Sequence, residues 1–536
     1  MRHGILRDFE APGRSVALGV HGMAATSHPM ATLAAIDVLR AGGNAMDAAI
    51  AACAVQCVAE PGSTGIGGDC FVLYAPRGAS TIHAFNGAGR TPAGTDAAAL
   101  RDQGFPAIPA SSPHAVTVPG AVDAWCRLAA DHGSLPLARV LEPAIALAAE
   151  GFAVAPRVAF DWARSQNLLA RRPAAAAYLP GGTAPSAGDM VRFPALARTL
   201  KAIADRGRNA FYEGPVAAEM VAVLRAEGGS HQVEDFAAAG GRYVAPISTR
   251  FRDYTVHECP PPGQGIIALL IMNILGHFPG SGDPVGPERL HIEIEAARLA
   301  YAVRNAILAD GSPATPHRVL SPDFAAELAA RIDPDRAATE LPSFSGPEHR
   351  DTVYLTVVDR DRNVVSFINS LFETFGSGIV APESGVLLHN RGMSFTLDPG
   401  HPNTLAPRKQ PMHTIIPGMM TESTAEGDRV AMAFGVMGGH FQAMGQAHLV
   451  TKVVDFGMDL QSAMALPRLF PVPGTPYVDA EATLPAATRA GLEARGHRFS
   501  SLHHPIGGAQ AIWIDWERGV LMGASEPRKD GLALGF

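Results

Sequence analysis

The chain has 536 residues, of which 47% are hydrophobic and 18% are charged, and its formal net charge is −8. This is enough apolar material for a large core, and the acidic balance without a basic block excludes a nucleic-acid-binding protein. No apolar run reaches the roughly 20 residues that a membrane-spanning helix needs, and the start lacks the apolar segment of a secretory signal. The five cysteines, a low and odd number, indicate a reduced, cytoplasmic protein without disulfides.

The N-terminal region predicts two helices followed by a strand. Thr26 or Ser27 is placed to cap the first helix, Pro29 suits its first turn, and two glycines after residue 41 end it. The second helix is rich in alanine, which enters a helix at no cost in side-chain entropy. The predicted order is a helix over 30–40, a helix over 45–59, a glycine-dense turn at 61–69 and a strand over 70–74.

The middle of the chain, residues 95–250, predicts mainly helices joined by loops rich in proline, glycine and alanine. A strand and turn at 254–265 precede a helical stretch from 266 and a long amphipathic helix over 287–308. Residues 311–350 contain six prolines and many charges. This composition predicts an exposed connector of low local stability.

The pattern changes to strands directly after the connector. Residues 351–359 and 364–370 are rich in β-branched and aromatic residues and flank a turn, so they predict a hairpin. The remaining prediction is a strand over 430–436, a helix over 442–454, and a C-terminal hairpin over 511–515 and 519–523.

Thr352 begins the first strand after the connector, and this position suggests a chemistry. A threonine at a free N-terminus carries its own base, because the α-amine titrates near pH 7.7–8.0 and is partly neutral at physiological pH. Attack of the Thr352 hydroxyl on the Asp351 carbonyl, an N-to-O acyl shift and ester hydrolysis would expose that amine. An Asp-Thr pair at a strand start is nevertheless common in ordinary sequence, so this signal alone is weak.

Several short sequence segments, which occur in a fixed order along the chain, make this interpretation of Thr352 specific. The chain resembles the gamma-glutamyltransferase family of N-terminal-nucleophile hydrolases from about residue 17 to the C-terminus. The matching segments are GGNAMDAAIA at 42–51, PGSTGIGGDCF at 61–71, VPG at 118–120, PPPGQG at 260–265, DTVYLTVVD at 351–359, FGSGIV at 375–380, ESGVLL at 383–388, the glycine pair at 438–439 and GASEPRK at 523–529.

The resemblance implies an α+β fold, a four-layer αββα sandwich in a single intertwined unit. It implies cleavage between Asp351 and Thr352 into a large subunit, 1–351, and a small subunit, 352–536. These fragments would form a heterodimer, which could itself dimerise.

The resemblance also assigns the catalytic group. Thr352 matches the nucleophile of the family, and Ser370 matches a second hydroxyl residue that hydrogen-bonds the nucleophile. Gly438 and Gly439 match the glycine pair whose N–H groups form the oxyanion hole. Glycine suits this role because the main chain must approach a tetrahedral oxyanion to about 2.7–3.1 Å.

The substrate clamp departs from the family pattern. An arginine that holds the substrate carboxylate aligns with Ala88, and Arg90 is shifted from it by two residues. The asparagine, glutamate and aspartate that hold the α-amine align with Phe372, Arg391 and Ser394, and a serine pair aligns with His413 and Thr414. Losing the acids and gaining an arginine removes attraction for an ammonium group and adds a carboxylate partner. The predicted substrate-binding residues are therefore Arg391, His413, Thr414, Phe372 and Arg90. A structural ion pair for Arg391 and an ordinary loop position for His413 are the competing interpretations.

The resulting hypothesis is an autoprocessing N-terminal-threonine hydrolase. It would cleave or transfer the acyl group of a γ-glutamyl or other small acidic amide through an acyl-Thr352 intermediate. One alternative is an oxamate-type small-amide amidohydrolase without γ-glutamyl activity, and another is an uncleaved, non-catalytic binding protein. No cofactor or metal is predicted, because His291 and Glu295 form only an isolated pair one helical turn apart.

Overall fold

The computed structural model describes residues 10, 13–79, 81–312, 316–340, 352–500, 502 and 504–536. Its centre consists of two seven-stranded sheets. The first contains, in spatial order, β1 (Ala17–Gly19), β20 (Val520–Ser525), β19 (Gly508–Asp515), β15 (Gly427–Met437), β14 (Gly418–Thr424), β9 (Tyr254–Glu258) and β8 (Ile247–Phe251). The second contains β21 (Leu532–Gly535), β2 (Met23–Thr26), β10 (Val353–Val358), β11 (Val364–Ser370), β3 (Asp69–Ala75), β4 (His83–Gly87) and β7 (Arg242–Val244).

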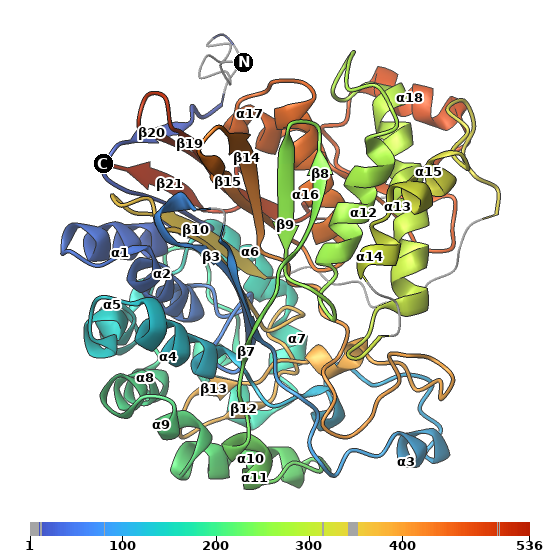
Figure 1. Cartoon of the computed structure of the whole chain (residues 1–536). Helices are drawn as coiled ribbons and strands as arrows, with labels where there is room; N and C mark the ends of the chain where they lie inside the picture. Colours follow the sequence, from blue (N-terminus) through green and yellow to red (C-terminus); the bar gives the residue numbers. More distant parts are fainter. Residues whose placement is uncertain are drawn as a thin grey trace.

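Helices cover the outer face of each sheet (Figure 1). Beside the second sheet lie α1 (Pro29–Arg40), α2 (Ala45–Ala59) and α4 (Ala121–His132), with α5 (Leu137–Glu150) packed on α2, and beside the first lie α12 (Gly265–Leu275), α16 (Phe441–Val454) and α17 (Leu460–Ala465). The predicted four-layer αββα sandwich is thereby confirmed. Further helices are α3 (Ala97–Asp102), α6 (Pro156–Arg164), α7 (Gln166–Leu169), α8 (Pro194–Arg206), α9 (Asn209–Tyr212), α10 (Pro215–Ala226), α11 (Val233–Ala237), α13 (Pro287–Ile307), α14 (Pro316–Val319), α15 (Pro322–Ala329) and α18 (Ala486–Ala494). Short strands are β5 (Phe152–Ala153), β6 (Met190–Val191), β12 (Val380–Ala381), β13 (Val386–Leu387), β16 (Leu469–Pro471), β17 (Tyr477–Ala480) and β18 (Arg498–Ser500).

Three apolar layers hold the sandwich together. One lies between the second sheet and α1, α2, α4 and α5, one between the two sheets, and one between the first sheet and α12, α13 and α16. Strands β10 and β11 are buried along their whole length, so they read as nearly continuous apolar runs rather than as an alternating pattern. They pair antiparallel as predicted, with Val353 opposite Asn369.

Helix α2 shows why alanine is frequent near the N-terminus. All of its residues are buried, and small side chains let it approach both the sheet and its neighbouring helices. A capping box between Asn44 and Asp47 starts it. The prediction for the cap of α1 was wrong: His28 caps this helix, because the Thr26 hydroxyl bonds the His28 carbonyl and the Ser27 hydroxyl bonds Glu60.

Two predictions on the connector and the helix before it need correction. Residues 311–350 were predicted to be an exposed connector of low local stability, but α14 and α15 lie within them and bury Val319 and Leu328. Helix α13 was predicted to be amphipathic, yet its charged residues Arg289, Glu293 and Glu295 are buried, because ion pairs satisfy their charges. Within the described residues, no helix combines the length and the hydropathy that crossing a membrane requires.

Candidate active site

Three polar residues lie in a row across the second sheet, at the same end of β10, β11 and β3. Ser370 is the register partner of Asp69, and Thr352 directly precedes Val353 at the start of β10. The hydroxyl oxygens of Thr352 and Ser370 are 3.1 Å apart, and both side chains are fully buried. The hairpin therefore brings together two hydroxyls that were predicted to interact.

Arg391 lies beside this hydroxyl pair on a short 3₁₀ helix, Arg391–Ser394. Its Nη1 donates to the Thr414 hydroxyl at 2.7 Å, and its Nη2 is 3.5 Å from the Ser370 hydroxyl oxygen. The guanidinium carbon is 4.0 Å from the centre of the Phe372 ring, a cation–π contact. No described residue accepts from its Nε. Burial lowers the pKa of Arg391 to about 9, while Asp69 acts in the opposite direction, so the side chain is charged at neutral pH.

Asp69 forms the anionic partner of this arginine and joins two histidines. Its carboxylate accepts from the backbone N–H groups of Gly89 and Gly120, and lies 3.1 Å from His413 Nε2 and 3.6 Å from His389 Nδ1. Burial alone would raise the pKa of the Asp69 carboxyl, but the neighbouring histidines and arginine lower it to about 2. Burial also lowers the pKa of His413 to about 3. At neutral pH the group thus contains one carboxylate, neutral His413 and one guanidinium.

Gly438 and Gly439 follow β15 in the other sheet and precede α16. Both have positive φ, +113° and +56°, a region that favours glycine. A Cβ on Gly438 would lie 2.8 Å from the Cα of Gly507, so the close approach of two main chains also requires glycine there. The Gly438 and Gly439 carbonyls accept from the first N–H groups of α16, at 3.1 and 3.2 Å.

Gln264, which was not predicted as a site residue, connects the Gly438–Gly439 segment to Thr414, the residue that accepts from Arg391. Its Nε2 donates to the carbonyls of Gly439 at 2.8 Å and Thr414 at 3.0 Å. Its Oε1 accepts from Arg304 at 3.0 Å, and Arg304 also lies 2.8 Å from His440 Nδ1. One amide from α12's N-terminal boundary therefore fixes two segments of the later half of the chain.

The other predicted site residues have different positions. Phe372 has a φ of +79°, and its N–H donates to the Ser370 hydroxyl at 2.9 Å. The Arg90 guanidinium pairs with Asp310 at 2.8 Å and is partly exposed, so it does not join the group around Thr352. Asp351, the predicted cleavage residue, lies outside the described residues.

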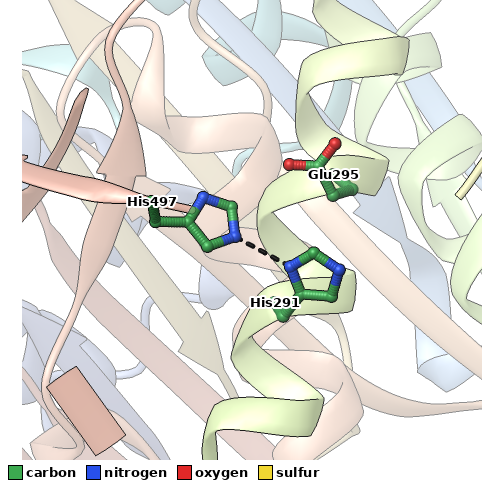
Figure 2. Close-up of side chains that lie close together, drawn as sticks. All are labelled: His291, Glu295 and His497. Atoms are coloured by element: carbon green, nitrogen blue, oxygen red, sulfur yellow. Dashed lines mark hydrogen bonds between the residues drawn. The ribbon is translucent and has the colours of Figure 1, made fainter. Parts of the chain in front are cut away.

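Asp69 and His389 were also missed by sequence reasoning. The sequence did contain a clue to Asp69, which ends the glycine-dense turn. A carboxylate directly before a buried strand is itself buried and needs hydrogen-bond or charge partners. Within the described residues, His291, Glu295 and His497 are the one group of three potential metal ligands whose ligand atoms all lie within 4.8 Å of one another (Figure 2).

Known proteins resemble this chain over nearly its whole length. The sequence profile of gamma-glutamyltranspeptidase matches residues 31–536. The chain belongs to the gamma-glutamyltranspeptidase family. It is 36% identical to a glutathione hydrolase-like YwrD proenzyme of Bacillus subtilis over 97% of this chain and 99% of the relative. It is 34% identical to the oxamate amidohydrolase proenzyme of Klebsiella pneumoniae, again over 97% and 99%.

Solved structures give the same assignment. A cephalosporin acylase from Bacillus halodurans superposes with a TM-score of 0.91 at 36% identity, covering 99% of each chain. This member of the gamma-glutamyltranspeptidase family is therefore an N-terminal-nucleophile hydrolase, an enzyme that acts on amides. The predicted family, fold class and enzyme class are confirmed.

Proposed function

We propose that Thr352 is the nucleophile of an autoprocessing amide hydrolase, freed as an N-terminus when the Asp351–Thr352 bond breaks. The observation that carries this proposal is the 3.1 Å contact between the Thr352 and Ser370 hydroxyls, with the Arg391 guanidinium 3.5 Å from Ser370. Both relatives are named as proenzymes, which supports proteolytic processing of this chain. Residues 1–351 and 352–536 would remain together, because β10 and β11 pair with β2 and β3 in one sheet.

In the proposed reaction the Thr352 α-amine takes the hydroxyl proton while the hydroxyl oxygen attacks the substrate carbonyl carbon. The N–H groups of Gly438 and Gly439 stabilise the tetrahedral oxyanion. The C–N bond then breaks, and the leaving amine takes the proton from the α-amine. Water hydrolyses the remaining Thr352 ester and releases a carboxylic acid, or an amine accepts the acyl group instead.

Arg391 supports a substrate with a carboxylate near the scissile bond. Its Nη2 lies at most about 6.6 Å from the Thr352 hydroxyl oxygen, the sum of 3.5 and 3.1 Å. The attacked carbon of a substrate lies about 3 Å from the nucleophile, and a carboxylate oxygen bound to the guanidinium lies about 2.8 Å from it. These two contacts together are almost as long as the separation between the two protein groups, so little distance remains between the carbon and the carboxylate. A carboxylate one or two bonds from the attacked carbon fits directly, as in oxamate. A γ-glutamyl group must fold back to make the same contact.

We therefore propose a small acidic amide as the preferred substrate and a γ-glutamyl amide as the second candidate. The 34% identical oxamate amidohydrolase favours the first substrate, and the glutathione hydrolase-like relative favours the second. Phe372 aligns with the asparagine that binds the substrate amine in the family, and its ring lies against the Arg391 guanidinium rather than offering a hydrogen bond.

A denaturing gel tests the processing step. From 56.0 kDa over 536 residues, cleavage before Thr352 gives fragments of about 37 kDa for 351 residues and about 19 kDa for 185 residues. The Thr352→Ala protein should remain a single 56 kDa band. A wild-type chain that stays intact, or a variant that still splits at this bond, would refute the proposal and favour an uncleaved binding protein.

A substrate screen tests the chemistry. Ammonia release from oxamate, malonamate and succinamate is compared with anilide release from a γ-glutamyl anilide, using wild type and Thr352→Ala side by side. We expect the highest kcat/KM for the amides with the shortest spacing between carboxylate and amide. Preference for the anilide would establish γ-glutamyl chemistry instead.

A further inference from the structure

A second cluster of functional side chains lies on α13, away from the proposed active site. His291 and Glu295 are one turn apart on this helix, and His497 reaches them from the turn between α18 and β18 (Figure 2). One ligand atom from each residue lies within 4.8 Å of the others, and all three residues are buried. The sequence predicted only the pair on the helix, and the third residue comes from more than 200 positions later.

We propose that His291, Glu295 and His497 bind a divalent transition-metal ion of the zinc class. Two imidazoles and one carboxylate are a ligand set that Zn²⁺ uses with a solvent molecule in the fourth position. Nothing in this proposal depends on the reaction proposed for Thr352.

The hydrogen bonds determine which ring nitrogens are available. His291 Nε2 lies 2.8 Å from the Asp333 carbonyl oxygen, which can only accept, so Nε2 carries the proton of the neutral ring. The lone pair of Nδ1 therefore points to His497 Nε2, 2.8 Å away. A backbone carbonyl that fixes the outer N–H of a ligating histidine is the usual support of a metal site.

His497 can present a lone pair to the same point. In the hydrogen-bonded form its Nε2 carries the proton and its Nδ1 has no partner among the described residues. Moving that proton to Nδ1 frees Nε2 to bind metal without ionising the ring. Two nitrogens at about 2.0–2.1 Å from a tetrahedral ion are about 3.3 Å apart, so the rings must separate by about 0.5 Å and turn until both lone pairs point at the ion.

The carboxylate is already oriented by its own partners. Arg298 Nη1 donates to one oxygen of Glu295 at 2.8 Å, and the Ala338 N–H donates to the other at 3.3 Å. Hydrogen bonds of this kind hold ligating carboxylates in place. The charges of Arg298 and Arg495 near His497 oppose a cation, so we expect micromolar rather than nanomolar affinity.

The three proposed ligands come from both sides of Thr352 in the chain, so a bound ion would affect how the two proposed fragments are held together. His291 and Glu295 precede Thr352 in the chain, whereas His497 follows it. Asp333 and Ala338, which support the ligands, lie on the connector that leads to residue 351. A bound ion would therefore tie the two proposed fragments to each other and to the connector.

Metal titration of the full chain tests the site. Protein stripped with a chelator is titrated with Zn²⁺ against a chromophoric chelator, and Co²⁺ is added separately to record its visible absorption. We expect one equivalent bound with a Kd of about 1 μM, and tetrahedral Co²⁺ bands. The His497→Gln variant should weaken binding at least about 50-fold, whereas His277→Gln, at an exposed histidine, should leave it unchanged.

Wild-type unfolding provides a measurement that needs no variant. The midpoint of thermal unfolding of the stripped chain should rise with Zn²⁺ concentration, because an ion that binds only the folded state stabilises it. A Kd weaker than about 100 μM, a stoichiometry far from one, an unshifted midpoint, or equal binding by the His497→Gln variant would each overturn the proposal.

Discussion

Thr352 and Ser370 are 18 positions apart in the chain, yet their hydroxyl oxygens are 3.1 Å apart at the open end of the β10–β11 hairpin. The register of the hairpin, with Val353 opposite Asn369, fixes this contact. The same row continues to Asp69 on β3. The proposed nucleophile is thus held by rigid strands rather than by a loop, which favours a well-defined attack geometry.

Replacing Ser370 by alanine should slow both processing and turnover by about fivefold. The variant loses a hydrogen bond to the proposed nucleophile, and a bond of this kind contributes about 1 kcal/mol. Ser366→Ala is the matched control, since Ser366 is equally buried on β11 but bonds the Tyr354 hydroxyl instead. Rates are followed by densitometry of the two fragments and by product release. Equal losses in both variants would contradict a specific role for Ser370.

Gly68→Ala should disturb the site, whereas Gly65→Ala should not. A Cβ at Gly68 would lie 2.4 Å from the Ser370 carbonyl oxygen, so β11 must move, at a cost of about 1–3 kcal/mol. At Gly65 the same atom meets only the Leu371 side chain, at an ordinary 3.4 Å. Urea unfolding and fragment formation check both variants. Full activity of the Gly68→Ala enzyme would show that the Ser370 backbone position is not critical.

Gln264→Ala should lower kcat about tenfold with little change in KM. Without the amide, the Gly439 and Thr414 carbonyls lose a shared donor, so the proposed oxyanion loop is less well fixed. Gln461→Ala, which removes a buried amide paired with Ser525 on the outer side of the first sheet, is the control. A Gln264 variant that changes only stability, as the control should, would assign it a purely structural role.

The binding of acidic amides should weaken above pH 9, because Arg391, whose pKa burial lowers to about 9, loses its charge as the pH rises through that value. At pH 10 about one molecule in ten retains the charge, so KM for oxamate should rise about tenfold. Oxamide, a neutral analogue, should show no such rise. On the acid side, Asp69 with a pKa of about 2 and His413 with a pKa of about 3 keep their charge states down to about pH 4. Parallel changes in KM for both substrates would contradict anion binding by Arg391.

Local sequence patterns were sufficient to predict several helices and strands. The alanine-rich helix over 45–59, the strand after the glycine-dense turn and the hairpin after Thr352 were all predicted and confirmed. Periodicity, capping and turn residues act over a few positions, so one chain carries enough information to find them. The pair of hydroxyls at Thr352 and Ser370 came from the family resemblance, and the predicted hairpin is the local element that carries both residues.

Contacts between residues far apart in the chain became known only from the folded structure. Asp69 reaches His413 across 344 positions, Gln264 reaches Gly439 across 175, and His291 reaches His497 across 206. No local pattern encodes these contacts, because they depend on how the sheets and helices pack. Burial then sets the chemistry: water is excluded from Arg391 and Asp69, so each charge must be balanced by a partner that folding alone brings into place.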